Sequence, residues 1–377
     1  MSEIDLHIVS FDIPWPDNYG GVIDVYHKAR SLAAAGVKIW MHCFTYGRTP
    51  AAELEKICTK VTYYPRDISK SKLINRLPYI VCSRDDESLK RNLLSDESPI
   101  LFEGLHTTYH LQDKAIASKF CIVRTHNIEH EYYHYLSQAE SNLFKRVYFN
   151  TEAHKLEVYE KILCQASSIA AISKTDTVYF NRNFSNKAFH LPAFHNADEV
   201  GSKLGKGTFS LYHGNLSVAE NEKAVLFLIK EVFGGTDLSF TIAGNHPSKH
   251  LKSVVKENAN ILFIENPDHD SMNALIKEAQ IHVLPTFQPT GVKLKLLNAL
   301  YNGRHVLVNP MMVDGTGLAE ICKIAESSDD FRMMIPTLMN EDFSATMKQN
   351  REEFLQHSFS NKKNAEVLIA KLVSRNT

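Results

Sequence analysis

The chain has 377 residues, of which 44% are hydrophobic and 23% are charged, and its formal net charge is -1 at pH 7. This length exceeds what a single hydrophobic core usually spans, so two domains are expected. The even balance of charge argues against a nucleic-acid partner. No segment reaches the roughly 18 apolar residues of a membrane span. The N-terminus also lacks the basic region of a signal peptide, so we expect a cytoplasmic protein.

Short apolar runs alternate with longer amphipathic ones in the first half of the chain. LHIVSF (6–11) reads as a buried strand, and the helix after it runs from Val22 to Ala35 and ends before Gly36. Further strands are predicted at 37–44, 99–103, 120–125, 167–173 and 188–194, and further helices at 143–164 and 174–182. Most of the six cysteines lie in apolar runs, without a CxxC pair, so buried thiols are expected.

A polar segment with several glycines, 195–207, reads as a linker between two domains. The alternation then restarts, with strands at 209–214, 238–244, 261–265, 281–285 and 305–309, helices at 221–233, 247–257 and 270–279, and another helix after Gly291. Strands separated by helices predict parallel sheets covered on both faces. The expected fold is α/β, with two Rossmann-like domains facing a central cleft. Their predicted bounds are 1–194 and 208–357, and a last helix within 358–377 should pack back on the first domain.

Ligands of open α/β sheets bind outside the carboxyl ends of the strands, so the loops at those ends are the candidate sites. In the first such loop Gly20 and Gly21 precede a helix, where backbone amides can approach a phosphate or a sugar. A flexible turn explains the pair equally well. The loop is not GxGxxG, which weakens a nicotinamide site. Trp15 in the same loop is either an aromatic platform or loop packing.

Two loops of the second half carry further candidates. Gly214, Asn215 and Lys223 follow the first strand there, and the alternative is a capped helix with a solvated lysine. Lys293 and Lys295 come just after Gly291, at a helix start where acidic residues are normally favoured. A bound diphosphate would explain both lysines, since charge-assisted hydrogen bonds are the strong ones. Solvated lysines are the alternative.

Two other stretches have functional and structural explanations. His126, His130 and His134 are spaced by four, as metal ligands on one helix face can be, but histidines packed at a surface or cleft fit the surrounding aromatic residues better. SKSKLINRLPYIVCSR (69–84) mixes cations with apolar residues. It is either a peripheral membrane contact or a solvated loop followed by a core strand. No GxSxG elbow or activated cysteine is evident.

Several motifs, in their order along the chain, resemble the GT-B glycosyltransferases of the retaining group 1 type. They are DNYGGVIDVYHKARSLAAAGVKIWMHCF (17–44), RTHNIEHEYY (124–133), LYHGNLSVAENEKAV (211–225), FTIAGNHPS (240–248) and GVKLKLLNALYNGRHVLVN (291–309). The resemblance implies transfer of a hexose from a nucleoside diphosphate sugar to a glycan or lipid-linked acceptor, with retention by a front-face mechanism. It implies a donor site mainly in the second domain and no metal or other cofactor. It also implies surface-polysaccharide assembly at the inner face of the membrane.

The resemblance also assigns roles to residues. His126 is implied as the catalytic residue beside the donor sugar, and Gly20 and Gly21 as contacts of the pyrophosphate or sugar. Lys293 and Lys295 are implied to neutralise the leaving diphosphate, and the segment 261–266 to flank the base.

Two family glutamates are replaced by Thr290 and Asn298, and a family arginine by Asn215. These departures leave a catalytically degenerate nucleotide-binding protein as one alternative and a sugar-nucleotide epimerase as another.

Overall fold

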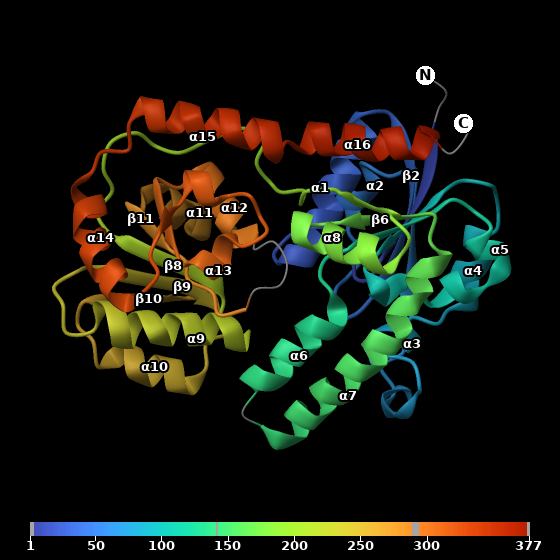
Figure 1. The fold of residues 1–377 in the computed structure, drawn as a ribbon, viewed down its shortest axis with the longest axis horizontal. Coiled ribbons are helices and arrows are strands. Elements are labelled where there is room, and N and C mark those ends of the chain that lie inside the picture. Colours follow the sequence, from blue (N-terminus) through green and yellow to red (C-terminus); the bar gives the residue numbers. More distant parts are fainter. Residues whose placement is uncertain (1–3, 141, 289–293, 375–377) are drawn as a thin grey trace. The chain divides into compact units, whose positions relative to one another are not determined.

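The computed structural model describes residues 4–140, 142–288 and 294–374. It divides the chain into two compact units (Figure 1). Within the described residues, unit 1 ends at Asn196 and resumes at Phe359, and unit 2 runs from Ala197 to Ser358. The boundary therefore falls inside the linker predicted at 195–207. The last helix belongs to unit 1, as do the first strands.

Unit 1 is built on one parallel sheet, whose seven strands within the described residues have the order β3-β2-β1-β4-β5-β6-β7. The strands are β1 (Ile4–Ser10), β2 (Val37–Thr45), β3 (Lys60–Pro65), β4 (Ile100–Glu103), β5 (Cys121–Thr125), β6 (Ser168–Ala171) and β7 (Ala188–His190). Buried residues alternate between the two faces of the sheet. Leu101 packs on the side of helix α1, and Phe102 packs on the opposite side. The sheet therefore has a hydrophobic core on each face, as expected for parallel strands.

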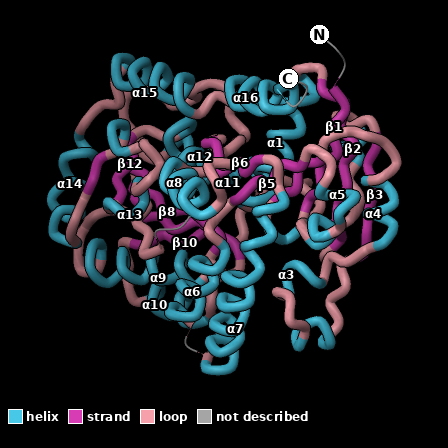
Figure 2. Tube along the Cα trace, turned by 45° about the vertical axis from the view of Figure 1, so that its right-hand side comes forward, coloured by secondary structure: helices cyan, strands magenta, loops and turns pink. Residues whose placement is uncertain are grey.

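Helices cover both faces of this sheet. They are α1 (Gly20–Ala34), α2 (Ala52–Glu55), α3 (Tyr79–Cys82), α4 (Glu87–Leu93), α5 (Lys114–Ala117), α6 (Glu129–Ala139), α7 (Leu143–Tyr159), α8 (Lys174–Asn183) and α16 (Asn361–Val373). Helix α16 contributes Leu368 and Leu372 to the same core as Val25 and Leu32 of α1. Helices α6 and α7 form a hairpin that extends away from the sheet (Figures 1 and 2).

Unit 2 repeats the architecture with a parallel sheet of order β10-β9-β8-β11-β12-β13. Its described strands are β8 (Ser210–Asn215), β9 (Phe240–Asn245), β10 (Ile261–Glu265), β11 (Ile281–Val283), β12 (His305–Val308) and β13 (Lys323–Ile324). Its described helices are α9 (Ala219–Phe227), α10 (Lys249–Lys256), α11 (His269–Glu278), α12 (Leu294–Asn302), α13 (Pro310–Val313), α14 (Ser328–Asn340) and α15 (Ala345–Ser358). The helix predicted after Gly291 is α12, and one of its faces is apolar, since Leu296, Leu297 and Leu300 are fully buried.

Counted within each unit, the first six strands of both sheets have the order 3-2-1-4-5-6, and unit 1 adds β7 at the far edge. Each sheet therefore has one point where the order reverses. It lies between β1 and β4 in unit 1 and between β8 and β11 in unit 2. Doubly wound sheets bind ligands at this point, outside the carboxyl ends of the strands. The α/β fold class expected from the alternating pattern is therefore confirmed. The two reversal points mark the two sheet edges where a ligand site is expected.

Some local expectations were wrong. The sequence pattern missed strand β3, which contains the half-exposed KVTYYP, and strand β13, which has only two residues. The helix expected at 143–164 ends at Tyr159, and a tighter 3-10 turn over Glu160–Gln165 follows. That turn leaves Cys164 exposed, whereas Cys43, Cys58, Cys82 and Cys121 are buried. Among the described helices, none is both long and apolar enough to cross a membrane.

Candidate active site

A buried ionic network fills the carboxyl edge of the unit 1 sheet. Helix α1 supplies Asp24 and Lys28, one turn apart, and strand β4 ends in Glu103. The Lys28 ammonium donates to Asp24 Oδ2 at 2.8 Å and to Glu103 Oε1 and Oε2 at 2.8 and 2.9 Å. All three residues are fully buried. Lysine and acidic residues are almost never fully buried unless paired, and here each is paired.

Arg124, near the end of β5, completes the network. It donates to Asp24 through Nε at 3.1 Å and Nη2 at 3.0 Å, and the Phe194 amide donates to the same carboxylate at 2.8 Å. Burial by itself would raise the Asp24 pKa, but the charges of Arg124 and Lys28 outweigh it and hold that pKa well below its usual range. At Glu103 burial is likewise outweighed by Lys28, so its pKa is lowered too. Both carboxylates are therefore ionised and paired.

His126 lies at the border of this network. It follows β5 directly, its side chain is 12% exposed, and its Nε2 is 3.3 Å from Glu103 Oε2. The two groups are within ion-pair distance but are not aligned as a hydrogen bond. The Phe11 ring stands edge-on to the imidazole, with 5.8 Å between ring centroids. The predicted catalytic histidine is thus held beside a buried carboxylate at the edge where ligands of this fold bind.

The glycine loop opens helix α1 at the same edge. The helix begins at Gly20, its N-cap Tyr19 makes no side-chain capping bond, and its first turn has no acidic residue. A Cβ atom at Gly21 would lie 2.6 Å from Phe11 Cζ, so a larger residue there would displace the Phe11 ring. Trp15 packs on Tyr26, with 4.8 Å between ring centroids. The backbone amides of the first turn can still receive an anion, since a helix leaves them without intrahelical partners.

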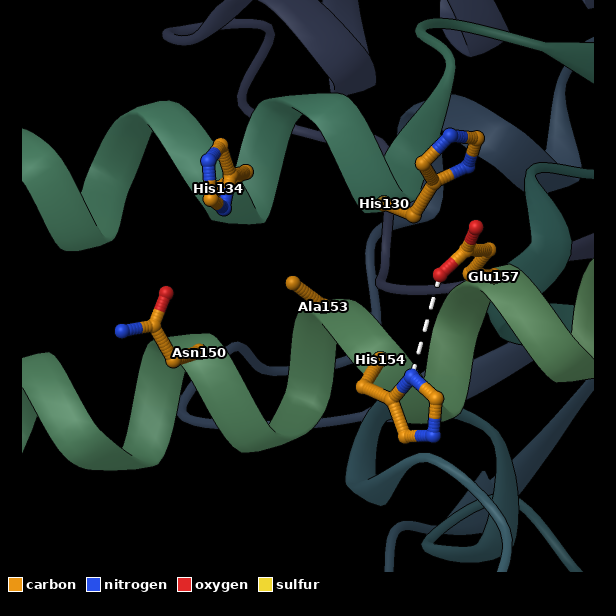
Figure 3. Close-up of a pocket in the computed structure, with 6 residues that line it drawn as sticks. All are labelled: His130, His134, Asn150, Ala153, His154 and Glu157. Atoms are coloured by element: carbon orange, nitrogen blue, oxygen red, sulfur yellow. Dashed lines mark ion pairs between the residues drawn. The ribbon is translucent and has the colours of Figure 1, made fainter.

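The metal hypothesis for the three histidines is wrong. His126 lies ahead of α6, so it does not share a helix face with His130 and His134. These two instead line an open hollow of about 420 Å³ between α6 and α7, together with Asn150, Ala153, His154 and Glu157 (Figure 3). Among the described residues, the one group with ligand atoms close enough for a metal ion is Asp24, Glu103 and His126. Its two carboxylates already receive the Lys28 ammonium.

The first loop of unit 2 is ordered by short-range hydrogen bonds. Asn215 is exposed, and its Oδ1 accepts from the Ser217 amide at 3.1 Å and the Ser217 hydroxyl at 2.8 Å. Gly214 has room for a Cβ, but one at Gly244 on the neighbouring strand would lie 2.2 Å from the Gly214 carbonyl oxygen. The tight packing at this edge therefore depends on Gly244. Lys223 is exposed, and its ammonium lies 5.1 Å from the centre of the Phe287 ring.

The start of α12 brings Lys295 to the unit 2 edge. Its ammonium donates to Tyr212 Oη at 3.0 Å and to Asn221 Oδ1 at 2.7 Å, both neutral groups. Asn298, one turn later, accepts a bond from Asn302 at 2.8 Å. The predicted donor contacts Thr290, Gly291 and Lys293 lie outside the described residues.

The ionic network was not predicted from the sequence, although the sequence contains signals for it. Asp24 and Lys28 are spaced by four within an apolar helix pattern, which puts two charges on one face of the helix. Glu103 and Arg124 end or nearly end two apolar strand runs. Charged residues inside buried patterns predict mutual pairing, because an unpaired buried charge is costly.

Comparisons with known proteins bear on this arrangement. Residues 208–349 match the family model described as "Glycosyl transferases group 1". Residues 208–349 form a group 1 glycosyltransferase domain. The chain is also 26% identical, over 94% of its length and 96% of the relative's, to a 44.6 kDa protein in the cps region of Klebsiella pneumoniae.

Solved structures with a similar fold are GT-B glycosyltransferases, and this chain shares the GT-B fold. HepE of Anabaena, in complex with UDP and glucose, has a TM-score of 0.66 at 10% identity and covers 99% of this chain and 100% of its own. A TarM variant of S. aureus in complex with UDP has a TM-score of 0.66 at 9% identity, with coverage of 99% and 100%. A glycosyltransferase of Rickettsia africae has a TM-score of 0.65 at 10% identity, with coverage of 99% and 98%. The resemblance to group 1 glycosyltransferases with a GT-B fold is confirmed, and the chain is a glycosyltransferase. Retention at the anomeric carbon stays a prediction.

Proposed function

We propose that this glycosyltransferase moves a hexose from a nucleoside diphosphate sugar to a glycan or lipid-linked acceptor, with retention at the anomeric carbon. The observation that carries the proposal is the group 1 match of residues 208–349, which include the predicted donor residues Gly214, Asn215, Lys223, Lys295 and Asn298. Structural relatives hold UDP, UDP-glucose or UDP-L-rhamnose. We therefore propose a uridine donor as the first candidate.

In this proposal the two edges have separate tasks. Lys295 and the first-turn amides of α12 neutralise the diphosphate as it leaves, because donors arranged in advance stabilise charge that develops in the transition state. His126 bonds the donor sugar, and Glu103 fixes the orientation of its ring. The departing phosphate accepts the acceptor's proton, so neither a dedicated base nor a metal cofactor is used. The relative in a cps region supports a role in polysaccharide assembly. We further propose that the reaction takes place at the inner face of the membrane.

A second candidate is a transferase fold that binds the nucleotide without turnover. The observation in its favour is Asn298, which stands where the family has a glutamate and whose oxygen already accepts a bond from Asn302. An amide bond to a ribose hydroxyl is worth less than a charge-assisted one, about 0.5–1.5 against 1.5–3 kcal/mol. The family match favours transfer over the epimerase alternative.

A thermal-shift panel with UDP, GDP, ADP, CMP and dTDP tests the donor site first. A ligand at 100 times its Kd stabilises the protein by about 2.7 kcal/mol. We expect one diphosphate to raise Tm and the matching sugar donors to be consumed in the presence of acceptor glycans. A nucleotide that binds while no donor is consumed would support the second candidate. If no nucleotide binds, both candidates are wrong.

A further inference from the structure

Two segments of unit 1 expose large apolar side chains where a folded protein normally buries them. The first is the start of α7. There Leu143, Phe144 and Val147 are 71%, 88% and 66% exposed. Fully burying side chains of this size stabilises a protein by about 1.5–3 kcal/mol each. Their exposure is therefore a sign of a surface that is covered in use.

The second segment is the connection between β3 and α3. It contains Ile68, Leu73 and Ile74, which are 58%, 41% and 88% exposed. From the sequence, 69–84 was either a peripheral membrane contact or a solvated loop followed by a core strand, and the structure shows an exposed segment followed by a short core helix, α3. Ile80, Val81 and Cys82 of α3 are core residues, so the exposed part ends before them. Part of the candidate membrane stretch is thus ordinary core.

The two segments lie on the same side of unit 1. Lys155 of α7 donates to the Leu73 carbonyl at 3.1 Å, and the Tyr79 amide donates to Glu152 of α7 at 2.6 Å. Both views show the start of α7 and the connection before α3 extending in the same direction from the unit (Figures 1 and 2). Twelve residues of helix separate the start of α7 from Lys155, about 18 Å at 1.5 Å per residue. The segments are therefore two nearby contact points.

Cations surround these apolar side chains. Residues 66–78 contain four Lys or Arg and one Asp, so their net charge is 4 − 1 = +3. Residues 140–147 contain two Lys or Arg and one Glu, so their net charge is 2 − 1 = +1. The chain as a whole has a net charge of -1. Lys70, Arg76, Lys145 and Arg146 are exposed. Lys72 is paired with Asp67 at 3.6 Å and Asp85 at 3.8 Å, so it adds less.

We propose that this face, formed by residues 68–76 and 143–147, docks on an anionic lipid surface. A second copy or a protein partner would offer a matching groove, but separate apolar side chains amid exposed cations suit a headgroup layer better. The apolar side chains enter the boundary between headgroups and acyl chains, and the cations stay with the lipid phosphates. The face goes beyond the transfer reaction and does not depend on it, although a lipid-linked acceptor would be presented at such a surface.

Vesicle flotation tests the proposal with the full chain. We expect binding to vesicles that contain phosphatidylglycerol, weaker binding to pure phosphatidylcholine, and loss of binding as salt is raised. Phe144→Ser with Ile74→Ser should weaken binding at least tenfold. Lys70→Ala and Lys145→Ala should each weaken it about fivefold. Val178→Ser and Met333→Ser are matched controls, because these side chains are 60% and 67% exposed elsewhere and should leave binding unchanged.

Three results would overturn the proposal. They are no binding to anionic vesicles, binding that the face variants retain, and a dimer in light scattering that the face variants abolish, which would assign the face to a second copy. Nucleotide thermal shifts on the same variants keep the two proposals apart. A variant that retains its Tm and nucleotide shift but loses vesicle binding has lost only the docking face.

Discussion

The two units have the same strand order, yet they place different chemistry at the point where that order reverses. Unit 1 buries a lysine, an arginine and two carboxylates that cancel one another's charge. Unit 2 brings a lysine to the corresponding edge and bonds it to a phenol and an amide. The comparison teaches that the lysine of unit 1 is sealed inside a buried ionic network, whereas the lysine of unit 2 is only partly buried and bonds neutral side chains among its partners.

The largest expected effect follows from removing the cation of unit 1. Lys28→Met leaves Asp24 and Glu103 without their shared donor and should cost about 3–5 kcal/mol of stability, as breaking other buried pairs does. Urea unfolding monitored by far-UV circular dichroism measures this. Lys252→Met is the matched control, since its pair with Glu265 is 40% and 37% exposed and should matter by under about 1 kcal/mol.

A double variant sharpens that prediction. Lys28→Met with Glu103→Gln removes a charge of each sign and should recover part of the loss, because the two residues share one network. Equal stability of Lys28→Met and the natural protein would show that the network is not structural.

The next largest expected effect is a pH dependence of stability, caused by a buried glutamate of unit 1. Burial, with the nearby Glu160 and Asp176, raises the pKa of Glu129 from 4.5 to about 8. The folded state therefore holds this proton more tightly than the unfolded state, and stability should fall as pH rises from about 5 to 8. The loss should reach a few kcal/mol, since one pKa unit is worth about 1.4 kcal/mol.

The Glu129→Gln variant isolates this effect. It cannot ionise, so it should lose less stability than the natural protein between pH 5 and pH 8 in thermal unfolding. The opposite shifts at Asp24 and Glu103 act at lower pH and are common to both proteins. Parallel pH profiles for the two proteins would contradict the assignment.

The His126→Ala variant tests the catalytic role of the histidine that borders the ionic network of unit 1. Loss of one donor that stabilises transition-state charge typically costs about 10²–10³ in turnover, and nucleotide affinity should stay near normal because His126 belongs to unit 1. Steady-state rates and calorimetric Kd values separate the two quantities. His154→Ala is the control, with a side chain that is 78% exposed. Full activity of His126→Ala would refute the role.

The smallest expected effect lies in unit 2. Lys295→Ala should weaken binding of the nucleoside diphosphate by about 1.5–3 kcal/mol, the worth of a hydrogen bond to a charged group. Isothermal calorimetry measures this loss, with the exposed Lys230→Ala as the control. The two lysines would then have different roles, since Lys28→Met lowers the free energy of unfolding and Lys295→Ala weakens binding of the nucleoside diphosphate. An unchanged Kd for Lys295→Ala would remove the contrast between the two edges.

The sequence by itself determined the α/β class and most strands and helices. These follow from local periodicity: buried parallel strands are short continuous apolar runs, and covering helices repeat every 3.6 residues. The glycine loop was also proposed from its place after a predicted strand, whereas His126 was proposed from the family resemblance. Strand β3 was not predicted because half-exposed edge residues such as Thr62 and Tyr63 interrupt the apolar pattern.

The tertiary structure alone decided which side chains meet. Lys28 and Glu103 are 75 positions apart, and Asp24 and Arg124 are 100 apart, so no local pattern pairs them. For 69–84 the sequence offered a solvated loop followed by a core strand, and the structure replaced the strand with the buried helix α3, because burial depends on what the rest of the chain packs against a segment. Periodicity is a property of neighbouring residues, whereas charge pairing and exposure are set by contacts between distant ones.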